Sequence, residues 1–294
     1  MNLRSSQRIY LLAIVPAWVL VTLFTIVPAV WAMSISFTPM SLVGPTAGST
    51  EFVGLDNYRT MLSHPDFFKF VRNSVVFIVG VAVLGTTGVG LVVALVINRG
   101  RRYGHRLAAI AFGAVVLAGV CPIPLAASIW GVLFDYRDGV LNAIITSLGL
   151  GRVDWLGEYP MLSVIVAESW RMVALAMIVF FGALQTLPVS MYEAARLDGA
   201  SSWTQLWTIT LPVIRPLASL VLLMTSIMAS GSFLLNEVLT GGGTSLQTET
   251  IALYSYHAAL INFRIAYGAA LSVIILVIAS LFAVVYVRLA KERI

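Results

Sequence analysis

Two ionisable residues stand inside an otherwise apolar stretch of the chain. Glu168 and Arg171 lie within residues 160–187, a segment with no other charged residue. Residues three positions apart share one face of a helix, so the carboxylate and the guanidinium can pair. Charged groups at membrane depth are costly and mark functional sites. Two uses remain open for this pair and for Trp170 between them: lining an aqueous path for a hydroxyl-rich ligand, or an ion pair that holds helices together.

A polar stripe is expected in the next apolar stretch. Serine and asparagine recur there at helical spacing, which suits either a path lining or hydrogen bonds between helices. The stripe comprises Ser226, Ser230, Ser232 and Asn236. The candidate path residues are therefore Glu168, Trp170, Arg171, Ser230, Ser232 and Asn236.

The composition indicates where these residues must lie. Of 294 residues, 59% are hydrophobic and 11% charged, whereas soluble domains carry about 25% charged residues. A bilayer-spanning helix needs about 20 apolar residues, and six such intervals occur. We therefore expect an all-α membrane protein, a single domain over residues 1–294, and no soluble enzyme, DNA-binding domain or disulfide scaffold. The expected spans are about 9–33, 73–98, 107–134, 160–187, 216–239 and 265–287, with a kink at Pro122-Ile123-Pro124 in the third.

The distribution of charge predicts the orientation. With six spans the two termini share one side, which holds three acidic residues and eleven basic ones: Arg4, Arg8, Arg99, Arg101, Arg102, Arg106, Arg196, Arg215, Arg288, Lys291 and Arg293. The other side holds nine acidic and six basic residues. The positive-inside rule places both termini in the cytoplasm. The basic residues are then a topology signal, and we expect no nucleic-acid partner. The alternative that 9–33 is a cleaved signal peptide is less favoured, because its uncharged run is longer than the usual core of such peptides.

The cytoplasmic loop over 188–215 has more local structure than a connector needs. Ser190 with Glu193 three residues later predicts a capped helix over 191–197. Asp198-Gly199 should end it, Ser201 or Ser202 should cap a second helix over 203–210, and Leu211-Pro212 should turn the chain back to the membrane. Trp203, Leu206 and Trp207 predict an exposed apolar surface where another protein docks.

This loop resembles a signature of the membrane subunits of ABC importers. The matching positions are Glu193-Ala194-Ala195, Asp198-Gly199-Ala200, Ile209, Leu211-Pro212 and Pro216. Gly54-Leu55-Asp56-Asn57-Tyr58, Leu239-Thr240-Gly241-Gly242-Gly243 and the six-span layout are similar to sugar permeases of the maltose-permease kind. One departure is that Leu234-Leu235 follows Phe233, where such permeases often have an acidic residue.

The resemblance implies a type I ABC importer permease fold, in the plasma membrane of a bacterium or archaeon, and a coupling loop. In that family the loop's short helix sits in a groove of an ATP-hydrolysing subunit. The implied coupling residues are Glu193, Ala194, Ala195, Asp198, Gly199, Ala200, Leu211 and Pro212. The expected partners are the lipid bilayer, a second homologous permease, two copies of the ATP-binding subunit and an external sugar-binding protein. The substrate would be a sugar or related polyol.

The sequence lacks the residue patterns for ATP binding, for catalysis and for a cysteine-based metal site. No glycine precedes Lys69 or Lys291, so the chain has no phosphate-binding loop of the Gly-Lys-Ser/Thr type. ATP and Mg²⁺ would then be bound by a partner. No histidine lies in any expected span, so we expect no catalytic residues, and the sole cysteine, Cys121, argues against a cysteine-based metal site. The alternatives left open are an ion-coupled secondary transporter, a channel or exporter with the same loop, and a permease for a glycerol-phosphate-type substrate.

Overall fold

A computed structural model describes residues 14–291, and in this range the chain is nearly all helical, with no β-strand. It divides into two compact units. The first contains the chain up to Phe67 together with Tyr254–Ile274, and the second contains Phe68–Leu253 and the segment from Ile275 onward. Residues 9–13 of the first expected span lie outside the described residues. The expected all-helical fold is confirmed.

The first unit is built on the apolar helix Ile14–Ile35, which includes the π-helical turn η1 (Thr22–Ile26) and α2 (Val27–Ile35). α3 (Asp56–Leu62) follows a loop that Asn57 closes, since its amide nitrogen donates to the carbonyls of Ser36 at 2.8 Å and Thr38 at 2.7 Å. The end of α14 (Ile251–Tyr256), the π-helical turn η5 (His257–Ile261) and the first residues of α15 (Ile265–Lys291) complete this unit.

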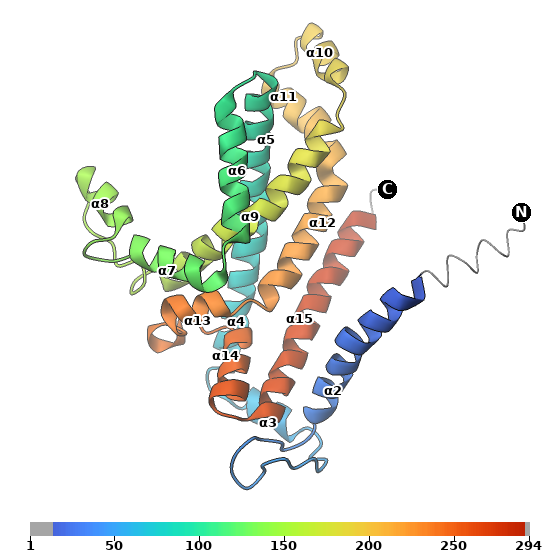
Figure 1. The fold of residues 1–294 in the computed structure, drawn as a ribbon, viewed down its shortest axis with the longest axis vertical. Helices are drawn as coiled ribbons and strands as arrows, with labels where there is room; N and C mark the ends of the chain where they lie inside the picture. The colour runs from blue at the N-terminus through green and yellow to red at the C-terminus, as the bar shows by residue number, and fades with distance from the viewer. Residues whose placement is uncertain (1–13, 292–294) are drawn as a thin grey trace, which may run out of the picture. The chain divides into compact units, whose positions relative to one another are not determined.

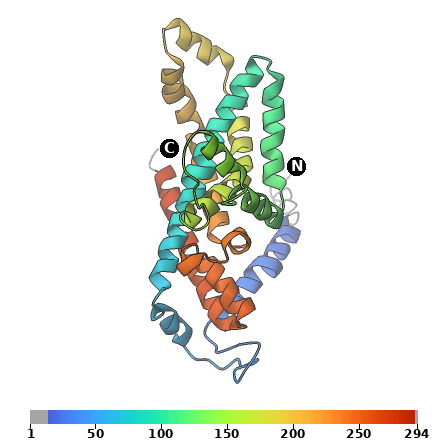
Figure 2. The same cartoon turned by 90° about the vertical axis from the view of Figure 1, so that its left-hand side faces the viewer.

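The second unit is a bundle around α9, as Figure 1 shows. α9 contacts α5, α6 and α12, and in Figure 2, where α7 and α8 face the viewer, α5 and α6 again lie side by side. Its helices are α4 (Phe67–Val79), η2 (Gly80–Gly88), α5 (Val89–Arg102), α6 (Arg106–Val120), α7 (Ile123–Leu133), α8 (Val140–Ser147), α9 (Pro160–Gln185), α10 (Val189–Leu197), α11 (Ser202–Gln205), η3 (Leu206–Thr210), α12 (Leu211–Ser230), α13 (Leu234–Thr240) and η4 (Thr244–Leu246).

Small residues allow these helices to approach one another. A Cβ on Gly90 of α5 would lie 2.6 Å from the Cβ of Ala176 on α9, and one on Gly119 of α6 would lie 2.5 Å from the Cβ of Ala174. Close backbone contact through glycine and alanine is the usual way that helices associate in a bilayer, where apolar packing alone gives no preference for protein over lipid. α9 is therefore clamped on two sides.

The apolar helices overlap the expected spans, with different bounds and with two breaks. The described residues contain five helices long and apolar enough to cross a membrane, or six if α6 and α7 together form one span. These two helices meet at 112°, a sharper change than the expected kink. Cys121 precedes a proline and is therefore extended (φ −64°, ψ 126°), which ends α6. The helix expected over 216–239 instead ends at Ser230, and Gly231–Phe233 separates α12 from α13.

Candidate functional site

The helix α10 of the loop over 188–215 begins two residues earlier than expected. Pro188 is its N-terminal boundary residue (φ −61°, ψ 133°), and no side chain caps the helix. Ser190 already lies in the first turn, so the expected capping box with Glu193 is wrong. The reason is Pro188 itself, because proline is held at a φ suited to a helix start and needs no amide partner there.

The end of α10 confirms the expected turn. Asp198 ends the helix, and Gly199 has a positive φ of 79°. The amide of Gly199 donates to the carbonyl of Arg196 at 3.0 Å, and the amide of Ala200 donates to the carbonyl of Ala195 at 2.9 Å. This pair of bonds is the Schellman motif, in which a left-handed residue satisfies the last carbonyls of a helix. Gly199 supplies that conformation without a steric cost.

The second loop helix is capped as expected but does not turn at Leu211-Pro212. The hydroxyl of Ser201 accepts from the amide of Thr204 at 3.1 Å. From Ser202 onward the helix is continuous to Ser230, through the wide π-turn η3 and past Pro212. The expected turn is therefore wrong. A proline normally interrupts a helix because it lacks an amide hydrogen and its ring crowds the preceding turn, but here the wide π-turn η3 before Pro212 makes room for the ring.

The two faces of α10 have different surroundings. The Tyr192 side chain is buried, and its hydroxyl shares a 2.9 Å hydrogen bond with Thr210. Leu197 on the other face is 90% exposed. Trp203 and Trp207 are also exposed and meet edge to face, with ring centroids 5.6 Å apart. Of the expected coupling residues, Glu193, Ala194, Asp198, Gly199 and Pro212 are exposed, and Ala195, Ala200 and Leu211 are half-buried.

The charged pair of α9 forms as the spacing predicts. Glu168 is fully buried, and its carboxylate accepts from Arg171 Nη2 at 2.6 Å and more weakly from Nε at 3.4 Å. The hydroxyl of Ser232, in the break between α12 and α13, donates to the same carboxylate at 2.9 Å. The Arg171 side chain is 16% exposed. Glu168 therefore links α9 to the broken helix.

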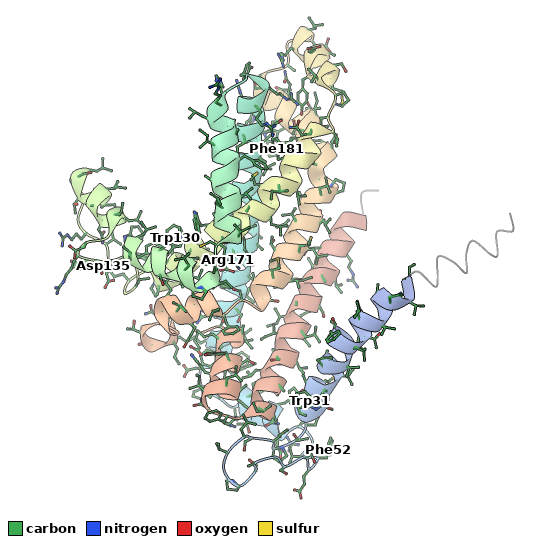
Figure 3. The ribbon with its side chains drawn as sticks, in the orientation of Figure 1. Trp31, Phe52, Trp130, Asp135, Arg171 and Phe181 are labelled. Atoms are coloured by element: carbon green, nitrogen blue, oxygen red, sulfur yellow. The ribbon has the colours of Figure 1, made fainter. Side chains whose placement is uncertain are left out.

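Two tryptophans meet where α7 packs on α9. Trp170 is half-buried, and its ring stands nearly perpendicular to that of Trp130 on α7, with centroids 6.1 Å apart. Figure 3 labels Trp130 and Arg171 where α7 leaves α6. The sequence reasoning missed Trp130, although its place six residues after Pro124 put an aromatic ring beside the proline break.

The expected serine and asparagine stripe does not lie on one helix. The hydroxyl of Ser230 donates to its own helix, to the Ile227 carbonyl, and that of Ser226 to Tyr286 at 3.2 Å. Because α12 ends at Ser230, Ser232 lies in the break and Asn236 lies on α13, so the stripe as one helical face is wrong. Asn236 is 1% exposed, and neither polar atom of its amide has a partner within the described chain. A buried amide without a partner requires an explanation.

Comparisons with known proteins define the class of this chain. Residues 90–293 match the family described as the binding-protein-dependent transport system inner membrane component. The chain is 31% identical over 295 residues to the trehalose/maltose transport system permease protein MalF of Thermococcus litoralis, covering 99% of this chain and 96% of that protein. It is 28% identical to the sulfoquinovosyl glycerol transport system permease protein SmoG of Agrobacterium fabrum, covering 98% of this chain and 92% of that protein.

The fold agrees with this match. A chain in the crystal structure of a bacterial alginate ABC transporter, in complex with an alginate pentasaccharide-bound periplasmic protein, superposes with a TM-score of 0.79 over 98% of this chain and 96% of that one, at 20% identity. The chain belongs to the family of inner-membrane components of binding-protein-dependent transport systems. It is a multi-pass transport subunit of an ABC importer, and ATP hydrolysis in such systems belongs to a separate subunit.

Proposed function

We propose that this chain is one membrane-spanning half of an importer that takes up a di- or oligosaccharide or a related polyol delivered by an external binding protein. The named relatives support the substrate class, since their printed names refer to trehalose, maltose and sulfoquinovosyl glycerol. A second, homologous permease would supply the other half of the path. Both termini would be cytoplasmic, because the side of the membrane that holds the termini and the loop over 188–215 carries most of the basic residues.

The observation that carries the coupling role is the exposed outer face of α10. Glu193 and Leu197 lie one helical turn apart on that face, and the Schellman turn at Gly199 holds the helix end in place. Such a surface fits a groove on an ATP-hydrolysing subunit, of which two copies would serve the two permeases. Glu193 would pair there with a basic side chain. Closure of those subunits around ATP and Mg²⁺ would move the loop and tilt the spans attached to it.

The break beside α9 is the proposed sugar path. Interrupted helices at membrane depth are tolerated where they line a cavity or pack on protein, and transporters often build binding sites there. Glu168, Arg171 and Ser232 form one polar cluster, and Asn236 brings an amide with unused hydrogen-bonding capacity. The Trp170 ring offers an apolar face to a sugar ring. Because Arg171 is already paired with Glu168, its charge is less available to a phosphorylated substrate.

The test is substrate-stimulated ATPase activity and uptake in vesicles containing this chain with its co-purified partners. Glu193→Ala should leave the complex assembled and lower both activities together. Glu158→Ala is the matched control, since Glu158 is an exposed carboxylate of another loop. Equal activity of both variants would reject the coupling role. Uptake of a glycerol-phosphate-type compound, with no response to loaded sugar-binding proteins, would reject the substrate class.

A further inference from the structure

A cavity lies beside α10, and its lining does not include the residues of the proposed coupling surface. Its volume is about 700 Å³, and the cytoplasmic ends of α5 and α9 line it together with α10 and the start of the next helix. Val189, Tyr192 and Arg196 face this cavity at helical spacing, whereas Glu193 and Leu197 are not among its lining residues. A ligand could therefore occupy the cavity while another protein binds the outer face of α10.

Three arginines from two elements converge on the cavity. Arg99 and Arg102 belong to the last turn of α5, and Arg196 belongs to α10. None of the three forms an ion pair with an acidic side chain in residues 14–291. The guanidinium of Arg102 lies 5.0 Å from the centre of the Tyr192 ring, so it is held near the lining by a cation–π contact. Three uncompensated positive charges around one space favour an anionic occupant.

The rest of the lining is amphipathic. Leu95 and Leu184 extend the cavity along α5 and α9, helices apolar enough to span a membrane. Tyr103 and Trp203, both exposed, stand beside the arginines. Tyrosine and tryptophan are typical of the boundary between bilayer and water. The sequence of charged, aromatic and aliphatic lining matches a lipid whose phosphate lies at the interface and whose chains extend into the hydrocarbon.

We propose that this cavity binds an anionic phospholipid of the leaflet on the loop side, with its phosphate held by Arg99, Arg102 and Arg196. Basic pockets at this depth commonly recognise anionic lipid headgroups. The bound lipid would brace the inner face of α10 against α5 and thereby make coupling depend on lipid composition. This inference adds a ligand to the proposed function and does not depend on which sugar is carried.

The experiment is titration of the purified, assembled transporter with phosphatidylglycerol or phosphatidylcholine, with bound lipids counted by native mass spectrometry. Phosphatidylglycerol should bind preferentially, and Arg102→Gln or Arg196→Gln should each weaken its binding about fivefold, the factor expected for one basic residue near a lipid surface. Arg101→Gln is the matched control. It removes the same charge from the same turn, but Arg101 is absent from the lining and lies over the Phe181 ring at 5.3 Å.

Further arms distinguish the other possible occupants. Arg102→Lys should keep more of the binding than Arg102→Gln, because a lysine retains the positive charge. In vesicles, substrate-stimulated ATPase should rise with phosphatidylglycerol content for the wild type and for Arg101→Gln but not for Arg102→Gln. Equal weakening by the control would overturn the proposal, as would full competition by inorganic phosphate, which indicates a soluble anion site. The proposal would also be overturned if Arg102→Gln or Arg196→Gln released the ATP-hydrolysing subunit while lipid binding stayed unchanged, since the arginines would then contact that subunit.

Discussion

The loop helix α10 and the cluster around Glu168 differ in the exposure and the partners of their carboxylates. Glu193 on α10 is exposed and makes no ion pair within the described chain, whereas Glu168 on α9 is fully buried and accepts hydrogen bonds from Arg171 and Ser232. An exposed carboxylate costs little to maintain, so it is free to serve a partner. A buried carboxylate must be compensated from inside the molecule.

This difference determines what a substitution reports. A substitution on the outer face of α10 should leave the chain folded and affect only the coupling to its partner proteins. A change at Glu168 should affect folding first, so a loss of transport there says nothing alone about the sugar path. Asn236 stands between these cases, because it is buried like Glu168 but lacks partners like Glu193.

The largest expected effect is on stability, from Glu168→Ala. The substitution leaves the mostly buried Arg171 guanidinium without its carboxylate, which should destabilise the fold by about 3–5 kcal/mol. Chemical unfolding of the purified complex would measure the loss. The double variant Glu168→Gln with Arg171→Met removes both charges and should recover most of it. A loss below about 1 kcal/mol for Glu168→Ala would mean that the pair contributes little.

A smaller effect on stability is expected at Gly199. A β-branched residue is strained at a φ of 79°, so Gly199→Val should cost about 1–2 kcal/mol in the turn. A Cβ at this position would meet no atom within 4 Å, so the penalty is conformational and not steric crowding. Substrate-stimulated ATPase should fall while the spans remain folded. Gly199→Asn is the control, because asparagine tolerates the left-handed region; equal loss in both would indicate a side-chain effect.

Asn236→Leu separates an effect on stability from an effect on transport more sharply than Glu168→Ala or Gly199→Val does. Leucine has a similar size and removes two buried polar atoms without partners, so stability should stay equal or rise by about 1 kcal/mol. If the amide binds sugar hydroxyls, uptake should fall despite the unchanged fold. Thermal unfolding and uptake measured on the same preparation provide the check. Normal uptake in a stable Asn236→Leu variant would remove this residue from the sugar path.

The local features of both regions could be predicted from the sequence. The Glu168–Arg171 pair follows from helical spacing, and the turn at Gly199 follows from the need for a positive φ. The Ser190 cap failed because Pro188 is an equally good helix start, and two adjacent signals competed for one boundary. The Leu211-Pro212 turn failed because a π-turn can absorb a proline that simple helical rules exclude.

Long-range contacts were beyond the sequence. Ser232 bonds a carboxylate 64 positions earlier, and nothing in its neighbourhood identifies that partner. The break at Gly231–Phe233 was also missed, because one glycine in an apolar stretch is a weak signal beside the continuous hydrophobicity around it. The break is what places Ser232 against α9, so the error in secondary structure and the missed contact have one origin.

The smallest expected effect concerns an exposed carboxylate that, unlike Glu193, has partners within the chain. Asp135, labelled in Figure 3, accepts from the amide of Asp138 at 2.7 Å and from that of Arg137 at 2.8 Å. These two bonds, that of Asp138 first, lower the pKa of the Asp135 carboxyl below its usual 3.8. A lowered pKa means that the turn gains stability while the carboxylate is charged.

That gain should be complete above about pH 4 and should fade as the pH drops below 3.8, where the unfolded turn takes up protons first. Hydrogen exchange of the peptide containing Arg137 and Asp138, read by mass spectrometry, would follow it. The ratio of wild-type to Asp135→Asn exchange should approach one as the solution becomes acidic. A ratio that does not change with pH would show that the charge of the Asp135 carboxylate does not stabilise the turn. Asp135 would then resemble Glu193, as an exposed carboxylate whose charge contributes nothing to the fold.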